Sequence, residues 1–139
     1  MTFHEYQQIA DYIRPKISKT QEEIWVLAFD SQIQLISETL LFRGTVSQCF
    51  FHPRDLFHFL VIHNAHQYVL IHNHISENCF PSDEDLLMTK QIVAMSQIFQ
   101  IELLDHLILS MTGFYSFKKD GVLERFYKNK NYLRNFKGE

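Results

Sequence analysis

The sequence predicts a single α/β domain with helices packed on the faces of a β-sheet. Its 139 residues suit one domain with one hydrophobic core. Hydrophobic residues make up 46% of the chain, with only four Gly and three Pro, which is typical of a compact globular protein. Segments with strand-like composition alternate with segments of helical spacing, and this interleaving is typical of the α/β class.

In the first third of the chain, a helix and two strands are predicted. Residues 3–14 carry apolar side chains near helical spacing, and Pro15 is expected to end that helix. Residues 23–30 and 33–42 are strand candidates, and the two-residue join between them suggests a hairpin. Gly44 marks a bend or the end of the second strand.

Five more elements follow: a helix, a strand, a second helix and two strands. Pro53 is suited to the first turn of a helix, so residues 53–64 predict one. Residues 67–72 are apolar enough for a buried strand, and 82–99 predict a long helix. Residues 101–111 and 115–117 predict the last two strands.

The most informative pattern joins the end of the third strand to the start of the long helix. It reads His-x-His-x(7)-Ser-x-x-Asp, from His72 and His74 to Ser82 and Asp85. Residues two apart in a strand point to the same face, so both imidazoles can converge on one point. Two imidazoles and a carboxylate form a reasonable zinc ligand set that leaves a fourth position open for water. Residues 75–81 form the only long loop and connect the two parts.

Each part of this pattern also has a purely structural interpretation. His72 and His74 could be a polar strand end exposed to water. Ser82 and Asp85, just after Pro81, resemble a capping box, in which Asp85 only reaches back to the start of its helix. Ser82 can serve a cap and a site at once. For Asp85 the two roles are expected to compete.

A hydrolase also needs a general base near the water. Glu38, on the second predicted strand, is the candidate that the sequence offers. Its alternative is an exposed glutamate on a strand.

Charge is unevenly distributed along the chain. Residues 1–117 carry 6 Lys/Arg and 13 Asp/Glu, whereas residues 118–139 carry 7 and 3. The acidic body does not resemble a nucleic-acid surface. The basic tail alternates its charges with aromatic residues, which could contact phosphates and bases. The favoured interpretation is an amphipathic segment that docks its aromatics on the core.

The cellular environment follows from what the sequence lacks. No apolar run approaches the roughly 18–20 residues that span a bilayer, so no membrane association is expected. No secretory signal is visible. The two cysteines, Cys49 and Cys79, are most simply free thiols in a cytoplasmic protein.

Five blocks in order give the sequence a family resemblance. They are Phe42-Arg-Gly-Thr45, His52-Pro-Arg54, His72-Asn-His74, Pro81-Ser82 with Asp85, and Leu103-Leu-Asp-His106. Together they resemble the RadC family, whose conserved part is a JAB/MPN domain that carries the JAMM metalloprotease motif. The similarity covers residues 17–123, and the whole chain of 1–139 resembles that domain alone, with a short N-terminal helix and a basic C-terminal tail.

The resemblance implies an MPN fold, a mixed β-sheet flanked by helices and related in architecture to the cytidine deaminases. It implies one Zn2+ ion held by His72, His74 and Asp85. Ser82 would steady the bound water or the oxyanion, and Glu38 would be the general base. The implied activity is cleavage of peptide or isopeptide bonds in a protein or peptide substrate. The alternative is a metal-binding module without turnover, or a DNA-associated module, since RadC proteins carry a DNA repair label.

The loop after His74 departs from the family pattern. Ile75 and Glu77 replace the usual Pro and Gly, so the loop backbone is expected to differ and Glu77 adds a charge near the site. Cys79 is a bystander thiol in the favoured interpretation, although a thiolate is a good zinc ligand.

Two further features leave alternatives open. The spacing from Glu38 to Gly44 is one residue longer than in many relatives, and a one-residue slip reverses the face of a strand. Either a bulge restores Glu38 to the site or the base is displaced. Asp105-His106 interrupts an apolar strand. A buried, mutually hydrogen-bonded pair is favoured over a pair that orients the metal site.

Overall fold

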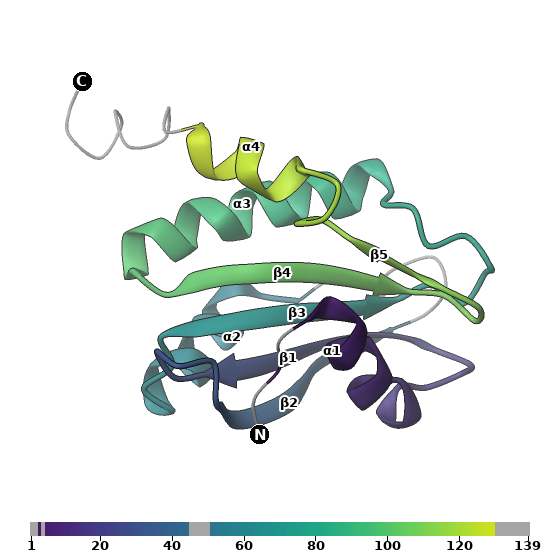
Figure 1. Ribbon diagram of the computed structural model, residues 1–139, viewed down its shortest axis with the longest axis horizontal. Coiled ribbons are helices and arrows are strands. Elements are labelled where there is room, and N and C mark those ends of the chain that lie inside the picture. Colours follow the sequence, from purple (N-terminus) through teal and green to yellow (C-terminus); the bar gives the residue numbers. More distant parts are fainter. Residues whose placement is uncertain (1–2, 4, 45–50, 130–139) are drawn as a thin grey trace.

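The computed structural model describes residue 3, residues 5–44 and residues 51–129. They form one five-stranded sheet with the strand order β2-β1-β3-β4-β5 (Figure 1). In chain order the elements are α1 (Tyr6–Ile13), the 3-10 turn η1 (Arg14–Lys16), β1 (Glu22–Phe29), β2 (Leu35–Gly44), α2 (Pro53–Ile62), β3 (Gln67–Asn73), α3 (Asp83–Phe99), β4 (Glu102–Leu109), β5 (Phe114–Ser116) and α4 (Val122–Lys128). The predicted α/β class and order of elements are confirmed.

The sheet is mixed, as the resemblance implied. β3 and β4 are parallel, whereas the pairs β1–β2, β1–β3 and β4–β5 are antiparallel. Parallel neighbours need a crossover, and α3 supplies it between β3 and β4. The first turn of α3 therefore follows directly on the loop that leaves the end of β3 (Figure 1).

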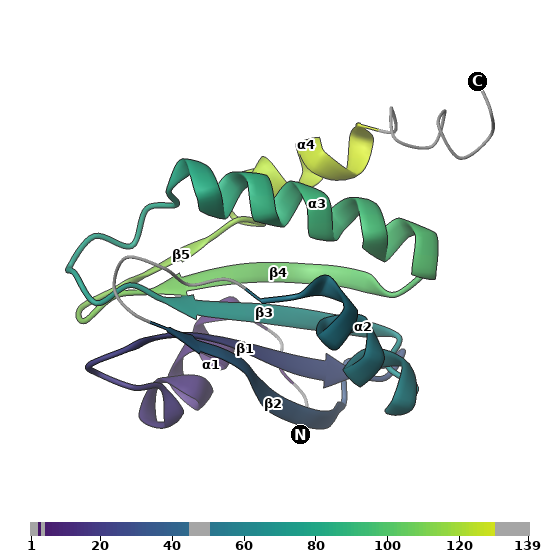
Figure 2. The ribbon, with the colours of Figure 1, turned by 180° about the vertical axis from the view of Figure 1, so that it is seen from behind.

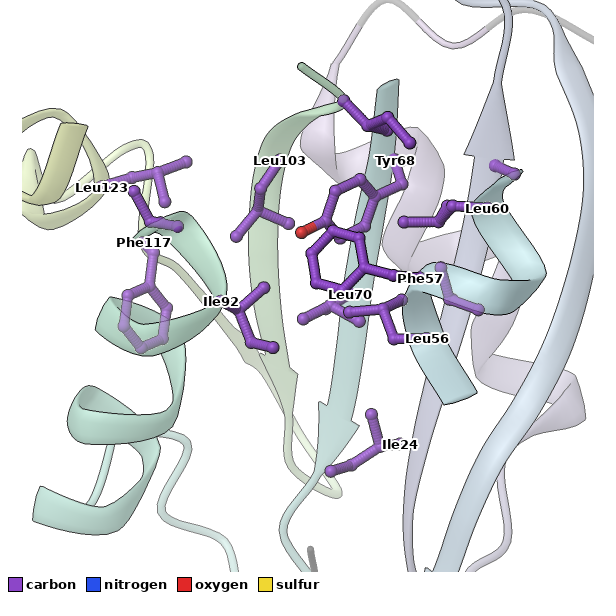
Figure 3. Packing of buried hydrophobic residues seen from close by; sticks show 14 of the residues in the cluster. Ile24, Leu56, Phe57, Leu60, Tyr68, Leu70, Ile92, Leu103, Phe117 and Leu123 are labelled. Carbon is purple, nitrogen blue, oxygen red and sulfur yellow. The ribbon is translucent and has the colours of Figure 1, made fainter. Parts of the chain in front are cut away.

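Alternation along the strands divides the buried residues into two faces. On one face Leu27, Val69 and Leu107 pack under α1. On the other face, which α2, α3 and α4 cover, Ile24, Leu70 and other apolar side chains form the larger core (Figures 2 and 3). A side chain on β1, β2 or β3 therefore faces either α1 or α3, and this alternation decides which residues can reach a site beside α3.

The end of the first helix agrees with the sequence prediction. α1 ends at Ile13, just before Pro15, and the proline lies in the 3-10 turn η1 that follows. One detail differs: β4 runs without interruption through Asp105 and His106.

The helix α4 shows what the start of the basic tail does. Phe126 and Tyr127 pack against the larger core, and the Tyr127 hydroxyl bonds to both backbone polar groups of Leu103. Docking of these aromatics, the favoured interpretation, is therefore confirmed; residues 130–139 lie outside the described chain, as does Cys49. None of the helices in the described ranges is long and apolar enough to cross a membrane.

Candidate metal centre

His72, His74 and Asp85 come together at the junction of β3 and α3, and we call them the His–His–Asp cluster. Each offers one potential ligand atom, and these atoms lie within 4.8 Å of one another. Asp85 Oδ1 is 3.1 Å from His72 Nδ1, and Asp85 Oδ2 is 3.0 Å from His74 Nε2. His72 is the next-to-last residue of β3, on the α3 face, and His74 lies just beyond the end of the strand, two residues further on, so the alternation of the strand aims both rings at the start of α3.

Asp85 belongs to the cap of α3 and to the cluster at once. The Ser82 hydroxyl accepts a hydrogen bond from the Asp85 backbone N–H at 3.1 Å, and the Ser82 N–H donates to Asp85 Oδ2 at 2.9 Å. The expected competition between the two roles was therefore wrong. An ionised carboxylate has about four lone-pair positions, so capping with one leaves others for the imidazoles.

The electrostatics of the cluster favour an ionised carboxylate. Burial opposes ionisation of Asp85, but the hydrogen bonds of His72 and His74 outweigh it and hold its pKa well below the usual range. The bond to Asp85 in turn raises the pKa of His74 against the effect of burial. In the absence of a metal, the proton shared with Asp85 does what a cation would do.

The donor set fits a tetrahedral zinc ion. Ligands about 2.0–2.2 Å from zinc lie about 3.4 Å apart, close to the separations observed here. His74 Nδ1 lies 3.0 Å from the Asn78 carbonyl, which can only accept, so Nδ1 carries the hydrogen and Nε2 is left for a ligand bond. His72 and Asp85 are buried while His74 is half-buried, so one side of the cluster is accessible. Within the described chain the group comprises these three residues only, without Glu77 or Cys79, whose thiol is free.

Glu38 does not lie at the cluster, which corrects the expectation that it would be the base. It pairs with Leu27, whose side chain packs under α1, and its carboxylate bonds to Tyr12 and Lys16. A bulge at Leu41 causes this, since Ile24 pairs with Phe42 but Trp25 pairs with Leu40. Of the two alternatives left open, the structure therefore shows the displaced one.

Glu22 is the carboxylate that the sequence analysis missed. Its Oε2 lies 3.8 Å from His72 Nε2, and its side chain is 14% exposed. Glu22 and Ile24 share a face of β1, and Ile24 pairs with His72, so Glu22 points toward the α3 side. Its neighbour Glu23 points to the other face and is bound by Ser18, Trp25 and Arg43. Neighbouring glutamates in a strand are indistinguishable by composition, and only the register with β3 separates them.

Asp105 and His106 are both buried, but they do not form a mutual side-chain pair. Adjacent strand residues point to opposite faces, and the only bond between them runs from the His106 N–H to the Asp105 carboxylate. Asp105 also accepts from Ser116 and from the Lys118 N–H, so it anchors the turn after β5. Burial raises the pKa of Asp105 in spite of these bonds.

His106 faces α3. Its Nδ1 lies 2.7 Å from the Thr89 hydroxyl, and its ring stacks on Phe117. Burial, with a smaller contribution from the nearby His72, lowers the pKa of His106 to about 3, so the ring is neutral. Arg54 pairs with its exposed neighbour Asp55 at 3.8 Å, a contact of little energetic weight.

The fold is that of a JAB/MPN domain, and the comparisons with known proteins agree. A family model described as the RadC-like JAB domain matches residues 3–122. The chain belongs to this family.

The similar proteins are UPF0758 proteins from bacteria. The chain is 35% identical over 117 residues to one from Staphylococcus aureus strain NCTC 8325, covering 84% of this chain and 54% of the relative. Relatives from Pelodictyon phaeoclathratiforme and Chlorobium chlorochromatii are 32% and 33% identical over 118 and 116 residues, covering 84% and 83% of this chain and 53% and 52% of theirs. The chain thus spans about half the length of the curated relatives it matches.

Proposed function

We propose that this domain is a zinc-dependent hydrolase of amide bonds, acting on a peptide or isopeptide bond in a protein substrate. The observation that carries the proposal is the convergence of His72, His74 and Asp85, with ligand atoms within 4.8 Å of one another. Two imidazoles and one carboxylate suit zinc, and three protein ligands leave the open position that a catalytic site requires.

A bound zinc ion would acidify a water molecule and polarise the substrate carbonyl. Ser82 supports the second effect, since its hydroxyl accepts from the backbone of α3 and keeps its own hydrogen to donate toward a developing oxyanion.

Glu22 is the proposed general base in place of Glu38. Its carboxylate is half-buried, shares a face of the sheet with His72 and lies 3.8 Å from the Nε2 atom of that histidine. A carboxylate at this position can accept a proton from water and deliver it to the leaving amine. The competing role, in which Glu22 only orients the His72 ring, predicts an effect on zinc affinity rather than on turnover.

Metal analysis of protein purified without a polyhistidine tag tests the proposal. We expect about one zinc ion per chain and hydrolysis of fluorogenic peptides or denatured casein that is lost with a chelator and restored by zinc. Protein that neither retains zinc nor binds added zinc would refute the metal site. Tight zinc binding without hydrolysis would favour the second candidate, a metal-binding module without turnover, for which the displacement of Glu38 is the supporting observation.

Zinc is expected to raise the melting temperature more strongly as pH increases from about 5 to about 8. Without metal, the raised pKa of His74 contributes stability that is complete below its unfolded value of about 6.5 and is lost as pH rises through the folded value. The lowered pKa of Asp85 contributes stability above about 3.9 that is lost as pH falls. The metal-free pair is therefore strongest between about pH 4 and 6.5.

Zinc needs a neutral imidazole, so it must displace the proton that His74 holds in this range, and the competition weakens at higher pH. Thermal unfolding at several pH values, with and without saturating zinc, measures the gain. A zinc-dependent gain that stays constant or falls toward pH 8 would contradict this prediction.

A further inference from the structure

We infer that Thr89 and His106 act as a positioning pair that fixes Asp85 relative to the two histidines of the cluster. The inference rests on the proposed metal site and concerns residues that do not touch the metal. Both side chains are fully buried, with exposed fractions of 0%.

The Thr89 hydroxyl makes two contacts that link α3 to β4. It lies one helical turn after Asp85 and donates to the Asp85 carbonyl oxygen at 2.7 Å. The Thr89 hydroxyl oxygen also lies 2.7 Å from His106 Nδ1 on β4. The backbone of Asp85 is thus held on both sides, at its N–H by Ser82 and at its carbonyl by Thr89.

The donors and acceptors available fix the direction of these two hydrogen bonds. A carbonyl only accepts, so the single hydroxyl hydrogen of Thr89 goes to Asp85. The hydroxyl then accepts from His106, whose Nδ1 must carry the hydrogen of the neutral ring. His106 Nε2 has no hydrogen-bond partner among the described residues. Burying an unpaired polar atom lowers stability, a cost that an apolar side chain would avoid, so packing alone does not account for a histidine here.

The same strand also positions the other half of the cluster. β4 is the parallel neighbour of β3, with Leu70 level with His106 and His72 level with Ile108. The His74 N–H donates to the Leu109 carbonyl of β4 at 2.7 Å. Both halves of the cluster are thus held against β4, the histidines directly and Asp85 through Thr89. Loss of the Thr89 bond would therefore allow Asp85 to shift while the histidines stay in place. Metal sites tolerate errors of only about 0.2 Å in ligand distance.

A second buried bond on the same helix provides a matched control. Ser96, two turns further along α3, bonds to the Tyr68 hydroxyl on β3. It also ties α3 to the sheet, and its exposed fraction is 1%. A purely structural role for Thr89 predicts that loss of either bond has the same consequences.

The test measures zinc affinity, by competition with a chromophoric chelator, beside the melting temperature of each variant. Thr89→Val, which keeps the shape and removes the hydroxyl, should bind zinc about 10-fold more weakly, at the lower end of the roughly 10–100-fold cost of losing an outer partner. Thr89→Ser keeps the hydroxyl and should restore most of the affinity. Ser96→Ala should lower the melting temperature and leave zinc affinity unchanged.

His106 tests the same bond from the β4 side, should Thr89→Val fail to fold. His106→Asn keeps a donor near the Nδ1 position and should retain more zinc affinity than His106→Leu. Wild-type affinity in Thr89→Val or His106→Leu would overturn the inference, and so would an equal loss in Ser96→Ala. A wild-type protein that binds no zinc would overturn the proposed function as well, so the two failures are distinguishable.

Discussion

Asp85→Asn is expected to weaken zinc binding by at least about 100-fold while the fold is retained. The substitution removes a direct donor, so its effect should exceed the roughly 10–100-fold that loss of an outer partner costs. The asparagine carbonyl can still accept from the Ser82 N–H, which Asp85 Oδ2 accepts in the native protein, so the cap of α3 persists. Titration of the untagged protein with zinc, by calorimetry or chelator competition, measures the change.

Asp83→Asn is the matched control for this experiment. Asp83 occupies the same first turn of α3 and carries the same charge, but it is exposed and lies outside the cluster. It should leave zinc affinity within about 5-fold, since an exposed charge near a helix terminus contributes only about 0.3–1 kcal/mol. Equal losses in both variants would mean that the net charge of the helix terminus, and not ligation by Asp85, attracts the metal.

The position of the cluster was predictable because it depends on local geometry. The two side chains of a His-x-His pair at a strand end point to the same face, and a Ser-x-x-Asp motif places its carboxylate in the first helical turn. What the sequence analysis misjudged was the capacity of Asp85. The prediction treated its carboxylate as able to serve one partner, whereas it serves the Ser82 N–H and two imidazoles together.

The proposed base was not predictable, since it depends on pairing between strands. Without the bulge at Leu41, continuing the register from Ile24 and Phe42 would bring Glu38 level with Ala28, on the α3 face. With the bulge it is level with Leu27, on the α1 face. A single extra residue thus turns the Glu38 carboxylate to the opposite face of the sheet. The apolar pattern of β2 does not indicate at which position the extra residue is accommodated.

The different contacts of Asp105 and His106 also follow from strand geometry. Adjacent in sequence, they were interpreted as one unit, yet the strand sends one toward the turn after β5 and the other toward α3. The partner of His106, Thr89, sits inside an apolar helical pattern where composition gives no sign of a bond to β4.

Glu22→Gln should lower the turnover number by about 10²–10⁴-fold while zinc stays bound, because general acid–base catalysis contributes about that factor. The amide keeps the size of the side chain near His72 but cannot take a proton from water. Steady-state kinetics on a fluorogenic peptide give kcat, and zinc titration of the same variant shows whether the metal site is intact. A loss of zinc affinity with little further loss of kcat in the zinc-saturated variant would instead assign Glu22 to orienting His72.

Glu38→Gln is the decisive comparison, since it makes the same chemical change on the opposite face of the sheet. The substitution breaks the ion pair between Glu38 and Lys16, whose side chains are 20% and 40% exposed, respectively. It should therefore cost no more than about 1 kcal/mol of stability. Its kcat should remain within about 2-fold of wild type, as expected of a residue with no part in proton transfer. If Glu38→Gln abolished turnover and Glu22→Gln did not, the assignment of Glu22 as the base would be refuted.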